Sequence, residues 1–286
     1  MICPMTTAHG PTHLWEAADS IRERVGSATR LFLFIDFDGT LAPIVSTPAL
    51  AALPAEHKDI LRALAAREDT VSVVISGRSV EDLRRRIGLP LTYVGDGGLE
   101  IQGPGFHHTV PGAHALRGRL YQLCNHLRTA LASYGGVLVE CKSLTATVHF
   151  RQAELPAVSA AYGIVCSAVR NELAFRVSLG KGAMEIQPAI AWNKGAAARW
   201  ILQRLSGREL DAICVGDDLM DEPMFTELAD GINVRIGESE TTAAEYWLEQ
   251  TDVTRLLRFL HNALGELRHS AVISPADWSQ ERSRLV

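Results

Sequence analysis

Short apolar runs alternate with helical patterns over roughly the first third of the chain. Three runs are apolar at nearly every position, as strands buried on both faces of a parallel sheet are, and they cover residues 31–35, 71–75 and 91–94. Pro54 begins a helical pattern after the first run, and Ser79 can cap a second helix that stops at Gly88. This β-α-β-α-β order predicts a parallel sheet with helices on its faces.

The hydrophobic pattern changes in the middle of the chain. Leucines recur at helical spacing from Leu116 to Leu131, and Gly135-Gly136 follows them. The rest of this block predicts strands at 137–141 and 144–150, a helix at 156–171, and strands at 175–179 and 183–187. An α-β-β-α-β-β order is typical of an open antiparallel sheet that carries helices. We therefore expect residues 108–188 to form a separate, inserted domain.

The parallel pattern then resumes. It predicts a helix from Asn193 or Lys194 to Leu205, a strand at 211–215, a short helix at 219–228, a strand at 232–236 and two further helices. The expected fold class is α/β, with a parallel-sheet core formed by residues 1–107 and 189–286 and an inserted α+β domain of αββαββ order.

Composition and charge narrow the class of protein. The net charge of -5, with 21% charged residues, offers no basic excess that would favour nucleic acid. No apolar stretch approaches the ~20 residues of a membrane helix, and the N-terminus lacks the pattern of a signal peptide. The five cysteines are scattered and odd in number, which favours a reducing, cytoplasmic setting. We expect a monomer with neither nucleic-acid nor membrane partners.

Polar side chains follow the predicted parallel strands. They are Asp36 and Asp38 after the first run, Ser76 after the second, Lys194 at a helix start, and Asp217 and Asp221 after the strand at 211–215. Ligands of open parallel sheets bind beyond the carboxyl ends of the strands, so we expect these groups to converge on one edge. Asp36 and Asp38 share a face because alternate residues of extended backbone do.

Carboxylates crowded at one edge either shift their pKa values or hold a cation among them. Two unit charges ~4 Å apart repel by about 4 kcal/mol at an effective dielectric constant of 20. Mg²⁺ fits such a site, because it prefers oxygen ligands and binds carboxylates together with phosphate. Asp36 could then attack phosphorus and form an aspartyl phosphate, while Asp38 protonates the leaving oxygen and activates water. Ser76 and Lys194 would hold the non-bridging oxygens.

The ordered motifs DFDGT, SGR, NKG and GDDLMD resemble those of the haloacid dehalogenase superfamily of phosphohydrolases. The resemblance implies a Rossmann-like hydrolase core, with Asp36 as nucleophile and Asp38 as general acid and base. It implies Mg²⁺ bound by Asp36, the carbonyl of Asp38, Asp217 and Asp221, and we rank Asp218 below Asp221 as a ligand. A true dehalogenase needs no second aspartate, so Asp38 favours a phosphatase.

Longer segments, DFDGTLAPI, YVGDGGLEI, VECKSLTATVHFR, GKGAMEIQP and GDDLMDE, are similar to those of trehalose-6-phosphate phosphatases. The resemblance implies that the insertion is a cap domain and that the enzyme hydrolyses trehalose 6-phosphate to trehalose and phosphate. It implies contacts of Glu140, Lys142 and Glu185 with the disaccharide hydroxyls.

Three core residues complete the expected substrate site, and two positions depart from the family pattern. The core residues are Thr40, Gly77 and Arg78. The departures are Gly97, where the family usually has a His, and Met220, where a Thr is common.

Other functions remain as hypotheses. Within the same chemistry, the alternatives are a phosphatase for another glycosyl or sugar phosphate and, ranked below it, a hexose phosphomutase. From a different class comes a phospho-acceptor signalling module, because receiver domains also place an Asp at a strand end near a hydroxyl group and a Lys. A receiver lacks the second acid that Asp38 supplies and has no inserted cap, so the sequence favours the phosphatase.

Overall fold

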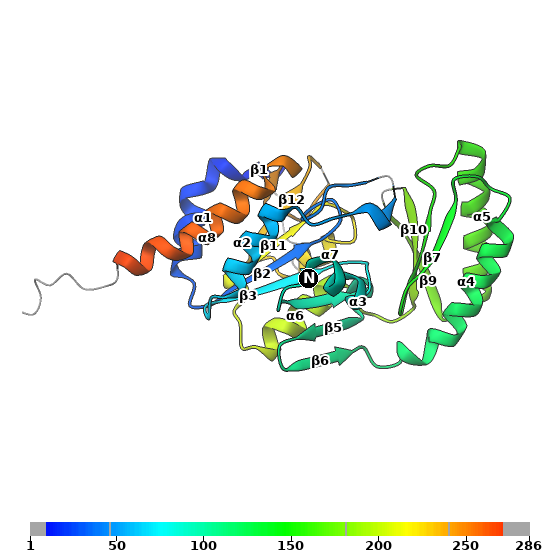
Figure 1. The fold of residues 1–286 in the computed structure, drawn as a ribbon, viewed down its shortest axis with the longest axis horizontal. Coiled ribbons are helices and arrows are strands. Elements are labelled where there is room, and N and C mark those ends of the chain that lie inside the picture. Colours follow the sequence, from blue (N-terminus) through cyan, green and yellow to red (C-terminus); the bar gives the residue numbers. More distant parts are fainter. Residues whose placement is uncertain (1–9, 46, 181, 240, 271–286) are drawn as a thin grey trace, which may run out of the picture.

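The computed structural model describes residues 10–45, 47–180, 182–239 and 241–270, and its strands form two separate sheets. The large sheet has the strand order β1-β13-β12-β11-β2-β3-β4-β5-β6, and the small sheet has the order β7-β8-β10-β9. The small sheet and its helices lie at one end of the molecule, and the large sheet fills the middle (Figure 1). The parts of the predicted core ranges at 1–9 and 271–286 lie outside the described residues.

The large sheet places its central strand under the expected site. Its strands are β1 (Thr12–His13), β2 (Leu31–Asp36), β3 (Thr70–Ile75), β4 (Thr92–Gly95), β5 (Glu100–Gly103), β6 (Phe106–Thr109), β11 (Ala212–Gly216), β12 (Ile232–Ile236) and β13 (Tyr246–Leu248). Pairing is parallel from β1 to β4 and antiparallel from β4 to β6. Every residue of β2 is buried, as its unbroken apolar run predicts.

Helices cover both faces of the large sheet. They are α1 (Ala18–Ser27), α2 (Ala55–Ala65), α3 (Val80–Ile87), α6 (Lys194–Arg204), α7 (Glu222–Glu227) and α8 (Val253–Ser270). One apolar cluster joins the sheet to α1, α2, α3 and α8, and a second joins the opposite face to α6 and α7. Ser79 caps α3 by accepting a hydrogen bond from the amide of Asp82 at 3.2 Å, and Gly88 ends it with φ 64°. Both helix signals are confirmed.

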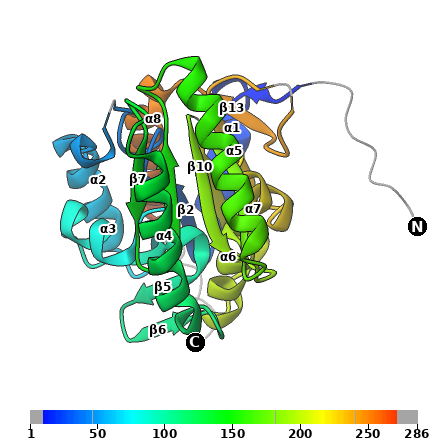
Figure 2. The same cartoon turned by 90° about the vertical axis from the view of Figure 1, so that its right-hand side faces the viewer.

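The small sheet and two helices form the cap. Its elements are α4 (Arg117–Leu131), β7 (Leu138–Cys141), β8 (Ala146–His149), α5 (Leu155–Asn171), β9 (Phe175–Gly180) and β10 (Ala183–Pro188). The strands are antiparallel, and an apolar cluster packs α4 and α5 on one face. Viewed from the cap end, these helices lie in front of the small sheet, so the sheet stands between them and the core (Figure 2). The predicted αββαββ order is confirmed.

Three features of the fold differ from the sequence prediction. The β5–β6 hairpin was missed, because its strands are short and Ile101 is their one fully buried residue. The expected boundary between 107 and 108 falls inside β6, which belongs to the large sheet. In place of two C-terminal α-helices, the described residues after β12 contain β13, the 3-10 helix Gln250–Asp252 and one α-helix, α8.

No helix in the described part of the chain is long and apolar enough to cross a membrane.

Candidate active site

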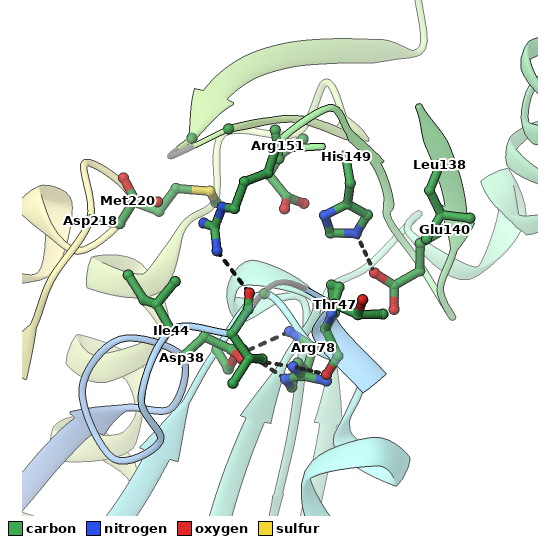
Figure 3. A pocket seen from close by; sticks show the side chains of 18 of the residues that line it. Asp38, Ile44, Thr47, Arg78, Leu138, Glu140, His149, Arg151, Asp218 and Met220 are labelled. Atoms are coloured by element: carbon green, nitrogen blue, oxygen red, sulfur yellow. Dashed lines mark hydrogen bonds and ion pairs between the residues drawn. The ribbon is translucent and has the colours of Figure 1, made fainter. Parts of the chain in front are cut away.

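A cavity of about 440 Å³ lies between the carboxyl ends of the core strands and the face of the small sheet that α4 and α5 leave uncovered. Asp38 and Arg78 reach it from the core, and Glu140, His149 and Arg151 reach it from the cap on the opposite side (Figure 3). Ten of the residues expected at the site line this cavity: Asp36, Asp38, Ser76, Gly77, Arg78, Glu140, Lys142, Glu185, Lys194 and Asp217.

Buried ion pairs fix the floor of the cavity. The Nζ of Lys194 donates to Oδ1 of Asp36 at 2.6 Å and to Oδ1 of Asp221 at 2.7 Å. The exposed fractions of these residues are 3%, 4% and 0%. Burial raises the pKa of Asp36, and the charges of Asp221 and Asp217 add to this rise while Lys194 opposes it. Asn193 caps α6, because its Oδ1 accepts a hydrogen bond from the amide of Ala196 at 2.9 Å. This cap places Lys194 at the start of the helix.

The loop after β11 brings further carboxylates to the same floor. Asp36, Asp217 and Asp221 each offer a carboxylate oxygen, and these oxygens lie within 4.8 Å of one another. Oδ2 of Asp221 accepts hydrogen bonds from the amides of Asp217 and Asp218, both at 3.0 Å, so the loop folds around this carboxylate. The donors are all oxygen and carry more negative charge than Lys194 can balance. This donor set fits a hard divalent cation.

The same geometry requires a glycine at position 39. Its φ is 86°, and a Cβ there would lie 2.3 Å from Oδ2 of Asp217. A side chain at this position would therefore displace the carboxylate, and only glycine lets the loop after β2 pass so close to it.

Asp38 is held by an arginine. Its two carboxylate oxygens accept from Nε and Nη2 of Arg78, both at 2.7 Å. Arg78 also donates to Asp82 at 2.8 Å and to the carbonyl of Pro48 at 2.8 Å. Burial lowers the pKa of Arg78, but the two carboxylates outweigh it and the net shift is upward. Arg78 was expected at the substrate, and it lines the cavity, but its guanidinium group is engaged by Asp38 and Asp82.

The remaining expected core residues occupy different depths. Ser76 is buried, and its Oγ accepts a hydrogen bond from the amide of Arg78 at 3.2 Å, which shapes the loop after β3. Thr40 is fully buried and lies behind the cavity wall, as does Asp221. The carbonyl of Thr40 accepts from Gln250 at 3.4 Å, and its hydroxyl has no partner among the described residues.

The cap wall is one face of the small sheet. Glu140 on β7 and Glu185 on β10 both pair in register with Thr147 on β8. Thr147 donates to Glu185 at 2.9 Å, and Lys142 lies 3.4 Å from the same carboxylate. Lys142 also reaches the core, because its Nζ donates to the carbonyl of Gly77 at 2.8 Å.

The sequence analysis missed two cap residues at the cavity. His149 lies 2.8 Å from Glu140 through Nε2, and Arg151 donates to the carbonyl of Val45 at 3.0 Å (Figure 3). Burial raises the pKa of Glu140, but His149 and Lys142 outweigh it, so the net shift is downward. The alternation in TATVHFR was the available signal for His149, since it puts that residue on the same face as Thr147.

The two departures from the family pattern are neighbours. Met220 lines the cavity, and a Cβ added at Gly97 would lie 3.6 Å from the Met220 methyl carbon and 3.9 Å from Oε1 of Gln187. The thioether therefore borders the space that a side chain at 97 would enter. Met220 thus gives this part of the wall an apolar side chain, and Gly97 leaves the space beside it unfilled.

A parallel core with a cluster of acids at its carboxyl edge, closed by an inserted cap, defines a protein of the haloacid dehalogenase-type fold. Residues 34–251 match the family model described as trehalose-phosphatase. The chain belongs to the trehalose-phosphatase family.

Curated relatives agree with this assignment. A trehalose-phosphate phosphatase of Mycobacterium marinum is 34% identical over 254 residues, which are 84% of this chain and 64% of the relative. One from Mycobacterium tuberculosis is 38% identical over 201 residues, which are 68% of this chain and 50% of the relative. The chain thus spans less than two thirds of the length of these relatives.

Solved structures share the fold. The C-terminal domain of the C. albicans trehalose-6-phosphate phosphatase superposes with a TM-score of 0.74 at 22% identity, covering 90% of this chain and 99% of that one. An Aspergillus fumigatus trehalose-6-phosphate phosphatase gives a TM-score of 0.60 at 24% identity, covering 89% of this chain and 100% of that one.

Proposed function

We propose that this chain is a Mg²⁺-dependent phosphatase that hydrolyses trehalose 6-phosphate to trehalose and phosphate through a phosphorylated Asp36. The observation that carries the proposal is the Lys194-bridged pair of Asp36 and Asp221 beneath a cavity whose opposite wall bears Glu140, Lys142 and Glu185. The names of the mycobacterial relatives support the choice of substrate.

The metal would be held by oxygen atoms of the floor. Asp36, Asp217 and Asp221 would provide carboxylates, and Asp38 would provide its backbone carbonyl. Mg²⁺, when bound, would offset the charge of the carboxylates and of the incoming phosphate. Lys194 would remain beside Asp36 and neutralise part of the charge that develops on the phosphoryl oxygens.

The reaction would proceed in two balanced steps. A carboxylate oxygen of Asp36 attacks phosphorus, the bond from phosphorus to the sugar oxygen breaks, and that oxygen takes a proton from Asp38. Asp38, now a carboxylate, removes a proton from water, and the water oxygen attacks phosphorus and releases phosphate and free Asp36. The bidentate pair with Arg78 holds Asp38 as a carboxylate, as the base of the second step requires. To act as the acid of the first step, Asp38, whose side chain is 42% exposed, would first leave this pair and take up a proton.

The cap would recognise the sugar. Carboxylates of Glu140 and Glu185 accept hydrogen bonds from hydroxyl groups, and the ammonium group of Lys142 donates to sugar oxygens. These side chains would lie over the disaccharide while the core acts on the phosphate.

The test is phosphate release from a panel of phosphorylated mono- and disaccharides at matched concentrations. The proposal requires trehalose 6-phosphate to give the highest kcat/KM. Higher kcat/KM on another glycosyl phosphate would favour the second candidate, a phosphatase for that sugar. The observation that favours this candidate is Met220, whose methyl carbon would lie 3.6 Å from a Cβ at Gly97. A stable phosphorylated Asp36 without turnover would instead indicate a signalling module.

A further inference from the structure

Asp96 is a buried acid that the proposed mechanism does not use. It follows β4 within the segment YVGDGGLEI, its exposed fraction is 0%, and its φ of 50° is uncommon for a residue with a side chain. Burying a carboxylate and holding it in a left-handed conformation both cost free energy. A chain that keeps such a residue between its core and its cap therefore gains something from it.

The carboxylate of Asp96 binds a turn of the cap. Its Oδ1 accepts the amide of Leu144 at 3.1 Å, the amide of Thr145 at 3.1 Å and the hydroxyl of Thr145 at 2.8 Å. The residues between β7 and β8 thus converge on one core oxygen. Burial raises the pKa of Asp96, and these hydrogen bonds oppose that rise.

The same turn is anchored by apolar packing. Leu144 is 1% exposed and packs in the linker cluster, which contains Leu99, Val110, Ala113 and Leu144, with Ile190 and Trp192 against it. These partners include residues of both segments that connect the core to the cap. The turn between β7 and β8 is therefore fastened at the base of the two connections.

Lys142 stands at one end of this turn. Its amide donates to the carbonyl of Thr145 at 2.9 Å, which closes the turn, and its Nζ reaches the carbonyl of Gly77. On the core side, the amide of Asp96 donates to the carbonyl of Arg78 at 2.7 Å. Hydrogen bonds thus run from the loop after β3 to Asp96, from Asp96 to the cap turn, and from Lys142 in that turn back to the loop after β3.

We propose that Asp96 is a positioning residue that fastens the cap turn 142–145 to the core and thereby sets Lys142 at the sugar end of the site. The part that concerns the sugar rests on the proposed function. The anchoring role itself concerns only contacts between core and cap.

Kinetics on two substrates test the positioning role. Asp96→Ala should raise KM for trehalose 6-phosphate about 10- to 100-fold, since it removes three hydrogen bonds to a charged acceptor. Hydrolysis of a small aryl phosphate should change less than about threefold, because its chemistry uses the core. Asp96→Asn retains an acceptor oxygen and should lose less than Asp96→Ala. Equal losses of Asp96→Ala on both substrates would overturn the proposal.

A double-mutant cycle tests whether Asp96 acts through Lys142. In a Lys142→Ala background, Asp96→Ala should cost less than about threefold further, because the residue it positions is already gone. Fully additive effects would overturn the proposal. Glu172→Ala, on the cap surface, is the matched control and should leave both substrates unaffected.

Hydrogen exchange provides a readout that needs no substrate. The amides of Leu144 and Thr145 should exchange at least about tenfold faster in Asp96→Ala than in the wild type, while those of β9 keep their protection. Unchanged exchange at 144 and 145 would overturn the anchoring role, even if trehalose 6-phosphate is not the substrate. If Asp96→Ala does not fold, Thr145→Val removes one of the three hydrogen bonds and should give the same pattern at smaller amplitude.

Discussion

The two walls of the cavity are built differently. On the core wall, Asp36, Lys194 and Asp221 are almost wholly buried and hydrogen-bond to one another. On the cap wall, exposure of the side chains is graded: Glu140 and His149 are 38% and 22% exposed, and Glu185 and Lys142 are 16% and 9% exposed. Buried, mutually bonded charges keep one geometry, whereas part-exposed side chains on a sheet face can rearrange around a ligand. This difference supports the proposed division, in which the core would break the bond to phosphorus and the cap would recognise the leaving group.

The largest effect should come from the core wall. Asp36→Asn should lower kcat by roughly 10⁴-fold or more, because an amide is a poor nucleophile toward phosphorus. The measurement is phosphate release, with circular dichroism and the melting temperature to check the fold. Asp59→Asn, at a surface ion pair with Arg62, is the control and should retain full activity. Wild-type turnover by Asp36→Asn would place the nucleophile elsewhere.

Removal of divalent cations should lower turnover nearly as much as Asp36→Asn does. In excess EDTA and verified metal-free buffer, turnover should fall to background, and added Mg²⁺ should restore it. Mg²⁺ should also raise the melting temperature, since a cation among Asp36, Asp217 and Asp221 relieves their repulsion. Asp217→Asn should weaken that thermal response. Full turnover in EDTA would remove the metal from the proposal.

Cap variants should separate recognition from chemistry. Glu185→Ala and Lys142→Ala should each lower kcat/KM on trehalose 6-phosphate by about 10- to 100-fold, because each loses a hydrogen bond to a charged group. A small aryl phosphate should be hydrolysed almost as before. Glu172→Ala serves as the control on the same domain. Equal losses on both substrates would break the division of labour between the walls.

The smallest effect concerns the support of Arg78. Burial raises the pKa of Asp82, but hydrogen bonds from Arg86, Arg78 and Arg85 outweigh it and bring the pKa from 3.8 to about 2. This contribution to stability is therefore present above pH 4 and is lost as the pH falls toward 2. Thermal melts should show Asp82→Asn to be less stable than the wild type at pH 6, by about 2–4 °C. The gap should narrow at pH 2.5, and a constant gap would contradict the assignment.

Much of the fold could be predicted because its signals are local. Strand β12 (Ile232–Ile236) matches the predicted run at both ends, and β2 differs by the single residue Asp36. Strands β5 and β6 carry few apolar residues, and β13 has only three residues, so their place in the sheet depends on neighbours distant in the sequence.

The sequence predicts which residues lie at the site better than it predicts which of them pair with one another. Strand ends identify which side chains meet at the edge of a parallel sheet, but not which of them bind each other. Asp38 and Arg78 were each expected to face the substrate, and only their distance shows that they form a bidentate pair. Asp96 lies in the family-like segment YVGDGGLEI, but its pairing could not be predicted, because its partners at 144 and 145 belong to the other domain.

The interrupted core has a consequence for how the protein reaches its folded state. Strand β2 pairs with β3 on one side and with β11 on the other, where Phe32 is opposite Ala212. Strand β3 is translated soon after β2, but β11 is translated only after the whole cap. One edge of the central, fully buried strand therefore stays unpaired until a partner of very long sequence separation is available, and such pairings form slowly. The nascent chain is most exposed to aggregation during this interval, so synthesis of the cap is the stage at which a chaperone has the most to protect.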